Sequence, residues 1–315
     1  MSSAHESLLP ALTTLCKDQI RQAGQRYTPG IDPKAPNLRI EPLFTAIENV
    51  ACGARALARF ESVLDAFSEA WDRAKHCSQR PDALQVRADN ARAFLLPMMD
   101  RLRARDAGAG EEWSNQLSGI ESDLLADMAH WRAEEAKLQQ ADGDSSHSSA
   151  RDTARGNMNA IGRCLAIMRD EKEYIQSPAF KALFDPQLLV RGEWGTGKTH
   201  LLCDVTQDRI GRGQATVLVL AKNFQGNVVA EICARIQPGR TAVEVFDRLD
   251  ELANETAERA VVILDGVNEG RRSEWRKAVT SLQALIAERQ NIGLIVTCRT
   301  PFEPIAIEQK DLGNI

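Results

Sequence analysis

The sequence predicts an all-α helical domain followed by an α/β domain built on a parallel sheet. In residues 1–140, apolar side chains recur every three or four positions, as they do on helices. Residues 157–315 instead alternate short apolar runs with helical patterns, which is typical of a parallel sheet covered on both faces. Between the two, residues 141–150 read ADGDSSHSSA and carry no apolar residue beyond alanine. Residues 141–156 are therefore predicted to be a flexible linker.

The helical half contains two clear apolar stripes. The first is Leu43, Ile47, Val50, Ala54, Leu57, Phe60, Leu64, Phe67 and Trp71, and the second is Trp113, Leu117, Ile120, Leu124, Met128 and Trp131. Such stripes indicate the core of a helical bundle, or alternatively a helix pair that recruits a partner or a second copy. A helix between them is expected to bend or break at Pro97. A shorter helix is expected at residues 8–20, and the proline-rich residues 26–39 indicate an extended connector.

The second half contains four candidate strands. They lie at residues 188–190, 216–220 (TVLVL), 260–264 (AVVIL) and 292–297 (IGLIVT). The helical patterns between them cover residues 199–212, 228–236, 243–252 and 273–289. A further helix is expected at residues 158–175, and only residues 305–307 offer a poor fifth strand.

Composition narrows the functional classes. The net charge is −5, so no global excess of positive charge indicates nucleic acid or an anionic membrane. No apolar run reaches about 18 residues, and the first residues do not resemble a secretion signal. The seven cysteines are scattered and never spaced as CxxC. Buried thiols in a reducing cytoplasm explain them better than a structural zinc site does.

A phosphate-binding loop is the most specific motif. Residues 192–199 read GEWGTGKT and satisfy the pattern GxxxxGK[ST], with an apolar run before it and an amphipathic helix after it. Its glycines allow backbone amides to point at phosphate oxygens, Lys198 adds a positive charge, and the Thr199 hydroxyl suits Mg²⁺. We expect ATP with Mg²⁺ to be the ligand. The predicted binding residues are Gly192, Glu193, Trp194, Gly195, Thr196, Gly197, Lys198, Thr199 and His200.

An acidic strand end follows. Four apolar residues carry Asp265 to the carboxyl edge of a buried strand, where ligands of parallel sheets lie, so Asp265 is the predicted second Mg²⁺ residue. Glu269 is the candidate general base, and Asn268 is a weaker candidate for polarising the attacking water. The structural alternatives are a turn-capping role for Asp265 and a solvated loop position for Glu269.

The last strand candidate ends in Thr297-Cys298-Arg299. If this strand lies between the first and third candidates, Arg299 or Thr297 could report whether a γ-phosphate is present. The alternative for Arg299 is a surface ion pair. The predicted catalytic residues are accordingly Lys198, Glu269 and Arg299.

These motifs resemble the STAND class of signalling P-loop NTPases. The stretch 265–269, Asp-Gly-Val-Asn-Glu, is similar to the acidic motif of NACHT proteins, and Arg299 closes the next strand as in that group. The similarity is closer to the bacterial antiviral STAND proteins. It is carried by Asp265, Asn268, Glu269, Gly270 and Trp275, by Thr297, Arg299, Phe302 and Glu303, by His200, Leu201 and Leu202, and by Arg26, Tyr27, Thr28 and Pro29. Gly266 stands where that group commonly has alanine, an exchange that we expect to change little.

The resemblance implies a signalling switch of an anti-phage defence receptor, in which slow Mg²⁺-dependent ATP hydrolysis controls homo-oligomerisation in the cytoplasm. It also implies a sensor array for a phage protein and an effector, and neither is recognisable in the sequence. We therefore expect the chain to be a fragment of a larger receptor or a truncated gene product. Two other readings stay open, an AAA+-like remodelling ATPase or helicase loader and a non-hydrolysing nucleotide-binding adaptor.

Overall fold

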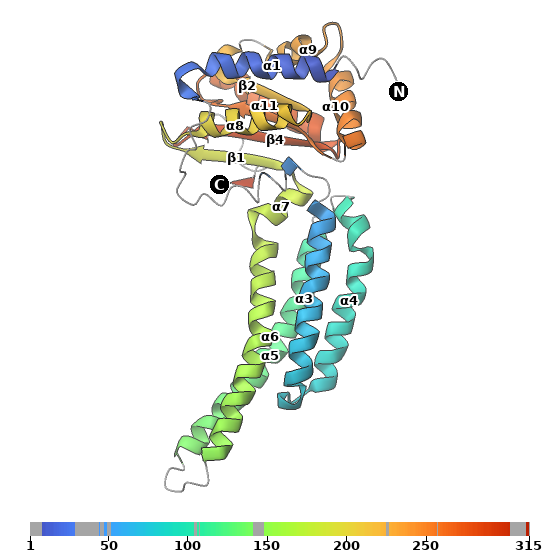
Figure 1. The fold of residues 1–315 in the computed structure, drawn as a ribbon, viewed down its shortest axis with the longest axis vertical. Coiled ribbons are helices and arrows are strands. Elements are labelled where there is room, and N and C mark those ends of the chain that lie inside the picture. The colour runs from blue at the N-terminus through green and yellow to red at the C-terminus, as the bar shows by residue number, and fades with distance from the viewer. Residues whose placement is uncertain are drawn as a thin grey trace. The chain divides into compact units, whose positions relative to one another are not determined.

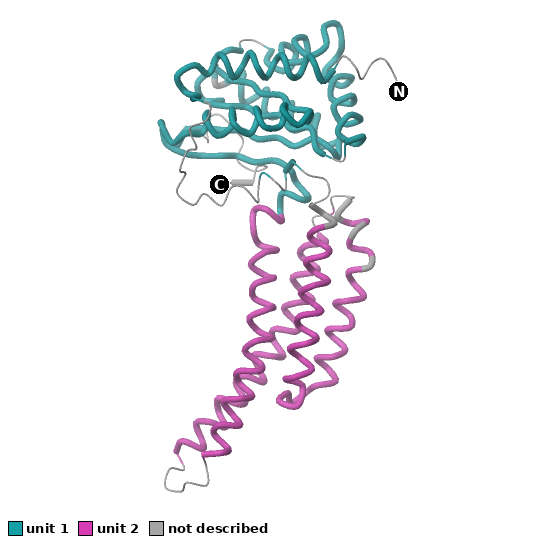
Figure 2. The backbone as a smooth tube through the Cα atoms, viewed as in Figure 1, with its two compact units in different colours: residues 1–52, 181–315 teal, residues 53–180 magenta. Residues whose placement is uncertain are grey.

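The chain folds into two compact units. The computed structural model describes residues 8–28, 44, 47–48, 52–103, 106, 108–140, 148–224, 227–256, 258–302 and 313–314. One unit comprises residues 53–180, and the other combines residues 1–52 with residues 181–315 (Figure 2). We refer to them as the helical unit and the sheet unit.

The helical unit is built on four long helices, α3 (Cys52–Ala74), α4 (Pro81–Arg103), α5 (Gly108–Gln140) and α6 (Ser148–Gln176) (Figure 1). Both predicted stripes contribute to its core, but the first was predicted too long. Helix α3 begins at Cys52, Ile47 belongs to the sheet unit, and Leu43 and Val50 lie outside the described residues. Phe60, Phe67, Trp71, Trp113 and Leu117 are all at most 2% exposed, and the rings of Phe60 and Trp113 lie 5.1 Å apart. Helix α4 continues through Pro97, so this proline does not interrupt it. The short helix η2 (Lys75–Cys77) follows α3, and α7 (Pro178–Phe184) follows α6.

The sheet unit contains a parallel sheet in the order β2-β3-β4-β1-β5. Its strands are β1 (Gln187–Gly192), β2 (Thr216–Leu220), β3 (Ala260–Asp265), β4 (Ile292–Arg299) and β5 (Gly313–Asn314). The first four coincide with the predicted strands. The two-residue β5 pairs with β1 at Leu188 and Leu189, whereas the predicted candidate at 305–307 lies outside the described residues.

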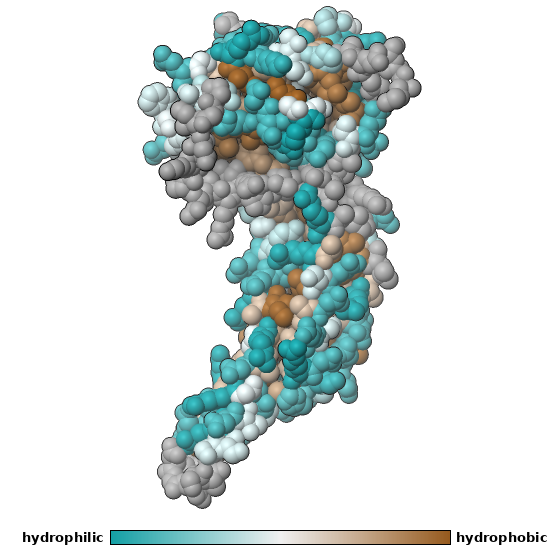
Figure 3. Space-filling view, in the orientation of Figure 1, coloured by the Kyte–Doolittle hydropathy of each residue, from teal (hydrophilic) through white to brown (hydrophobic). Residues whose placement is uncertain are grey.

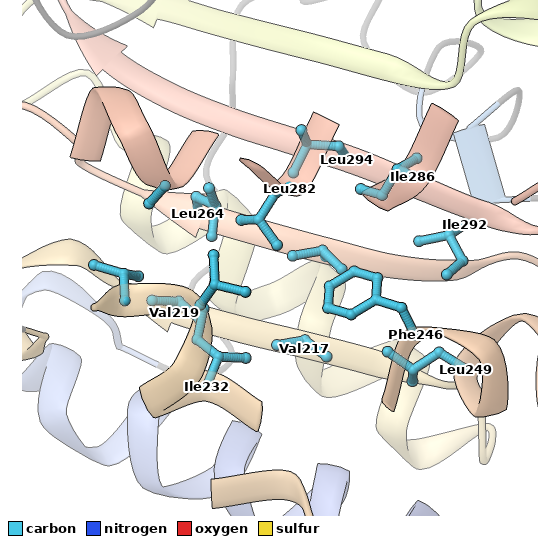
Figure 4. Close-up of a cluster of buried hydrophobic side chains, with 14 of the residues drawn as sticks. Val217, Val219, Ile232, Phe246, Leu249, Leu264, Leu282, Ile286, Ile292 and Leu294 are labelled. Carbon is cyan, nitrogen blue, oxygen red and sulfur yellow. The ribbon is translucent and has the colours of Figure 1, made fainter. Parts of the chain in front are cut away.

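Helices cover this sheet. They are α8 (Lys198–Gly211), α9 (Val228–Ile236), α10 (Ala242–Thr256) and α11 (Arg272–Ala287), with the short η4 (Ala221–Asn223) after β2. Side chains of β2, β3 and β4 meet those of α9, α10 and α11 in one apolar cluster (Figure 4). The alternate strand residues Leu218, Ile263 and Ile295 are also completely buried. Burial of both faces explains why these strands are continuously apolar.

The N-terminal helix α1 (Leu8–Ala23) belongs to the sheet unit. Its buried Leu8, Leu12 and Leu15 join the cluster beside β2, which is an edge strand. Two side chains of α1 also bond the backbone of β2, since Cys16 Sγ donates to Thr216 O at 3.1 Å and Gln19 Oε1 accepts from Leu220 N–H at 3.1 Å. Covering an edge in this way protects it from pairing with another chain.

The described residues at 47–48 are held in the sheet unit by buried arginines. Arg259 donates from its backbone N–H to Glu48 O at 2.7 Å, and its guanidinium reaches Ile47 O at 3.4 Å. Arg209 is completely buried and lies 3.6 Å from the Glu48 carboxylate. Burial raises the pKa of Glu48, although Arg209 opposes this effect.

The observed division corrects the predicted boundaries of 1–140, 141–156 and 157–315. The first helix, α1, belongs with the sheet rather than with the helical domain, because its apolar face packs on β2. Residues 148–156 form the first turns of α6, which pairs with α5 along the helical unit. The unit boundary consequently falls near residue 180, and residues 141–147 lie outside the described part of the chain.

On the face that Figure 3 shows, hydrophilic residues predominate among the described residues, with apolar areas between them. Among the described helices, none is both long and apolar enough to cross a bilayer. Six cysteine side chains are described by the structure, those of Cys16, Cys77, Cys164, Cys203, Cys233 and Cys298, and all six are buried.

Candidate functional site

The sheet register brings three strand ends together. Strand β4 lies between β1 and β3, which is the position that the predicted role of Arg299 requires. Gly192 at the end of β1 is paired with Arg299 at the end of β4. A pocket of about 220 Å³ opens at this edge. It is lined by Arg26, Trp194, Gly195, Thr196, Gly197, Lys198, Thr199, His200, Asp265, Gly266, Asn268, Glu269, Thr297, Cys298 and Arg299.

The predicted phosphate loop connects β1 to α8. Gly195 and Gly197 adopt φ values of +80° and +82°, in the left-handed region that side chains rarely enter. Helix α8 begins at the next residue, Lys198, so its free backbone amides face the loop. At Gly192 a β-carbon would lie 3.1 Å from Thr196 Oγ1 and 3.3 Å from Lys198 Nζ. The glycines therefore allow both the turn and the close approach of Lys198.

Lys198 turns back into the loop. Its Nζ donates to the carbonyls of Gly192 and Glu193 at 2.7 Å each and to Thr196 Oγ1 at 3.0 Å. Burial lowers the pKa of this lysine, an effect that nearby Asp265 opposes and Arg299 reinforces. Gly192 and Glu193 thus contribute carbonyls that hold Lys198, whereas the predicted residues from Trp194 to His200 line the pocket directly.

Asp265 is held by two threonines. Thr199 Oγ1, on the first turn of α8, donates to Oδ2 at 2.7 Å, and Thr297 Oγ1, on β4, donates to Oδ1 at 2.7 Å. The Thr297 hydroxyl also accepts from Gly266 N–H at 2.8 Å and is completely buried. Thr297 therefore positions the acidic strand end.

The loop after Asp265 is fixed by short-range packing. Val267 N–H donates to Thr297 O at 3.1 Å, and Glu269 N–H closes a turn on Gly266 O at 2.7 Å. A β-carbon at Gly270 would lie 2.2 Å from Nε1 of the buried Trp275. This contact gives a structural reason for the Gly270 and Trp275 pattern noted in the sequence.

The backbone at Gly266 differs from what we expected for a position where alanine is common. Its φ is +68°, and a β-carbon would lie 3.1 Å from Glu269 Cδ. A non-glycine residue in the left-handed region costs about 1 kcal/mol. The expectation that alanine would change little at this position was therefore wrong for this backbone.

Glu269 and Arg299 form an ion pair through Glu269 Oε1 and Arg299 Nη2. The other oxygen, Oε2, accepts from Arg26 Nη1 at 2.7 Å. Asn268 Oδ1 accepts from the backbone N–H of Arg299 at 3.0 Å, which ties the acidic loop to the end of β4. Both carboxylate oxygens of the predicted general base are therefore engaged by guanidinium groups.

His200 lies beside the segment that follows α1. Tyr27 and His200 have ring centroids 5.2 Å apart, and Thr28 N–H reaches His200 Nδ1 at 3.4 Å. His200 Nε2 also lies 3.1 Å from Asp204 Oδ2, one turn along α8. Burial, with Asp204 as hydrogen-bond partner, raises the pKa of Tyr27 to about 12.

The structure gathers every predicted site residue at one sheet edge and adds Arg26, which the functional assignment omitted. A signal was present, because residues 26–29 read RYTP within a stretch that otherwise indicated only a connector. Comparisons with models of protein families, with curated proteins and with solved structures found no match.

Proposed function

We propose that this chain is a P-loop NTPase that binds ATP with Mg²⁺ at the edge formed by β1, β3 and β4. The observation that carries the proposal is the junction of β1 and α8. There, two left-handed glycines precede the helix start, Lys198 bends into the loop, and Thr199 bonds Asp265. Backbone amides at a helix start, together with a lysine, favour phosphate groups.

The donor set fits a magnesium ion. Mg²⁺ prefers oxygen ligands, and the Thr199 hydroxyl and the Asp265 carboxylate already lie 2.7 Å apart. These two residues would hold the ion, with Thr297 fixing the orientation of the carboxylate. When bound, Mg²⁺ neutralises charge on the phosphate oxygens during phosphoryl transfer.

The protein residues have separable roles in this proposal. Lys198 binds phosphate oxygens once it exchanges its bonds to the loop carbonyls. Glu269 orients water and accepts its proton, and Arg299 balances negative charge at the end of β4. Hydrolysis is expected to be slow, because Glu269 is engaged by two arginines.

The direct test compares Lys198→Ala with Lys277→Ala. Lys277 is exposed on α11 and does not line the pocket, so it provides a matched loss of charge. We expect Lys198→Ala to lower ATP affinity at least a hundredfold in calorimetric titrations, because it removes charged contacts that contribute about 3 kcal/mol. Lys277→Ala should retain wild-type affinity. Unchanged binding by Lys198→Ala would overturn the phosphate-loop assignment.

The chemical roles are tested separately. We expect Asp265→Ala to weaken the Mg²⁺-dependent part of ATP binding and Glu269→Gln to retain binding while losing hydrolysis. Phosphate release and affinity should be measured on the same preparations. Hydrolysis by Glu269→Gln at the wild-type rate would exclude Glu269 as the base.

At the biological level we propose a STAND-like signalling switch of cytoplasmic anti-phage defence. This rests on the sequence resemblance, and a phage protein trigger and homo-oligomerisation on activation follow from it. The test is whether a non-hydrolysable ATP analogue increases the molecular mass in solution. A mass that stays the same with ADP and the analogue would contradict nucleotide-controlled assembly.

A non-hydrolysing nucleotide-binding adaptor is the second candidate. The observation that favours it is the double engagement of Glu269 by Arg26 and Arg299. Tight ATP binding with no detectable phosphate release by the wild-type chain would select this reading.

A further inference from the structure

The segment that follows α1 reaches the site from more than 160 residues earlier in the chain. It consists of η1 (Gly24–Arg26) with Tyr27 and Thr28, and Arg26 lines the pocket. Helix α1 anchors it, because Cys16 and Gln19 bond the backbone of β2. The ring contact of Tyr27 with His200 fixes the segment at its other end. Arg26 is therefore held at the pocket from both sides.

Arg26 and Arg299 share one carboxylate. Arg26 approaches Glu269 Oε2 and Arg299 approaches Oε1, so each oxygen has its own guanidinium partner. The Glu269 side chain is 16% exposed, whereas those of Arg299 and Arg26 are 28% and 40% exposed. The carboxylate is the most enclosed member, and the arginines remain accessible from the pocket.

This arrangement sets two guanidinium groups in competition with water for the Glu269 carboxylate. A carboxylate oxygen accepts about two hydrogen bonds, so each donor that it engages leaves fewer acceptor positions for water. Here both oxygens accept from guanidinium donors. Release of the two guanidinium groups would therefore free acceptor positions on Glu269 for the water that it orients.

Phosphate is the ligand that can cause this exchange. Arginine binds phosphate and carboxylate groups through the same fork of donors, and a terminal phosphate carries more charge than a carboxylate. With Lys198, three cationic side chains line the pocket against the carboxylates Asp265 and Glu269. A diphosphate lacks the terminal group that would compete with Glu269 for the arginines.

We propose that Arg26 is a residue of the triphosphate site, and that Arg26 and Arg299 hold Glu269 inactive until a γ-phosphate takes over their guanidinium groups. The inference rests on the proposed function and adds its regulation. The N-terminal segment then discriminates tri- from diphosphate, because the exchange of partners occurs only with the former. A ligand shifts such an equilibrium only through its different affinity for the two states.

The experiment is a double-mutant cycle on binding rather than on turnover. Affinities for the non-hydrolysable analogue AMP-PNP and for ADP, both with Mg²⁺, are measured calorimetrically for the wild type, Glu269→Gln, Arg26→Gln and the double variant. Removing the competing charge in Glu269→Gln should raise AMP-PNP affinity about tenfold and change ADP affinity less than twofold. When Arg26 is already replaced by Gln, Glu269→Gln should raise AMP-PNP affinity only about threefold, because only Arg299 then remains to be released from Glu269.

Arg21→Gln is the matched control. Arg21 lies on α1, just before the segment that carries Arg26. Its side chain is 76% exposed, it pairs with Asp18, and it does not line the pocket. We expect it to reproduce wild-type affinities. If Arg26→Gln does not fold, Arg26→Lys provides the comparison, because it keeps the charge without the guanidinium fork.

The outcomes separate the two proposals. Glu269→Gln could raise AMP-PNP affinity equally with Arg26 present and with Arg26 replaced, or it could change AMP-PNP and ADP affinity equally. Either result would overturn the role of Arg26 while leaving nucleotide binding intact. Absence of binding to the wild-type chain would instead overturn the proposed function, and the present inference with it.

Discussion

Replacing Thr297 with valine tests how the acidic strand end is held. Valine keeps the shape and the β-branch of threonine and suits a strand equally well, but it lacks the hydroxyl. That hydroxyl donates to Asp265 Oδ1 at 2.7 Å and accepts from Gly266 N–H at 2.8 Å. Thr297 is 0% exposed, so water cannot replace either bond without a rearrangement.

The magnitude follows from the two lost bonds. A hydrogen bond to a charged acceptor contributes about 1.5–3 kcal/mol, and a buried N–H left without a partner costs about 1–3 kcal/mol. Because Asp265 keeps its bond from Thr199, we expect Thr297→Val to destabilise the sheet unit by roughly 2–5 kcal/mol. Thr297→Ser keeps the hydroxyl and loses one buried methyl group, which costs about 1 kcal/mol.

Hydrogen exchange is the suitable assay, because two compact units need not unfold in one transition. Exchange of peptides from β3 and β4, followed by mass spectrometry, reports the opening free energy of the sheet unit. Peptides from α5 serve as an internal reference, since they belong to the helical unit. Valine and serine variants that differ by less than about 0.5 kcal/mol would refute the reasoning that the hydroxyl network holds Asp265.

Three further predictions concern stability. Gly266→Ala should destabilise the protein by about 1 kcal/mol, because the φ of Gly266 is +68°. Gly156 lies inside α6 with open space around it, so Gly156→Ala should stabilise the protein by about 0.5–1 kcal/mol. Thermal unfolding of the two variants should show these opposite signs. Burial raises the pKa of the Cys16 thiol from 9.0 to about 12, so the folded state binds this proton more tightly than the unfolded state does. The free energy of unfolding should therefore fall as pH rises from 9 towards 12. Urea unfolding at pH 8 and pH 10 measures this change, and equal free energies at the two pH values would contradict the prediction. Glu48→Gln should cost about 3 kcal/mol by leaving the buried Arg209 without its nearest carboxylate, and a loss below 1 kcal/mol in chemical unfolding would show that the pair contributes little.

The local elements were predictable from the sequence because their signals lie within short windows. Strands β2 and β3 start at the predicted residues, and the loop 192–199 lies between a strand and a helix as its pattern indicates. Continuous apolar runs and glycine spacing encode such features without reference to distant parts of the chain. The same reasoning placed Asp265 and Arg299 at strand ends, and it left open whether the two strands are neighbours, which the observed strand order shows them to be.

Other features depended on contacts that no short window contains. The periodicity of α1 predicts a helix with one apolar face, but it does not say whether that face packs on the bundle or, as observed, on β2. Arg26 meets Glu269 across 243 positions, and the positive φ of Gly266 depends on how the loop is tied to β4. By itself the sequence determined the elements and the phosphate-binding pattern, because these rest on local periodicity and on backbone requirements of individual residues. Only the tertiary structure decided which helix covers the sheet edge and which arginines share the acidic residue, because burial and charge pairing act between residues that are far apart along the chain.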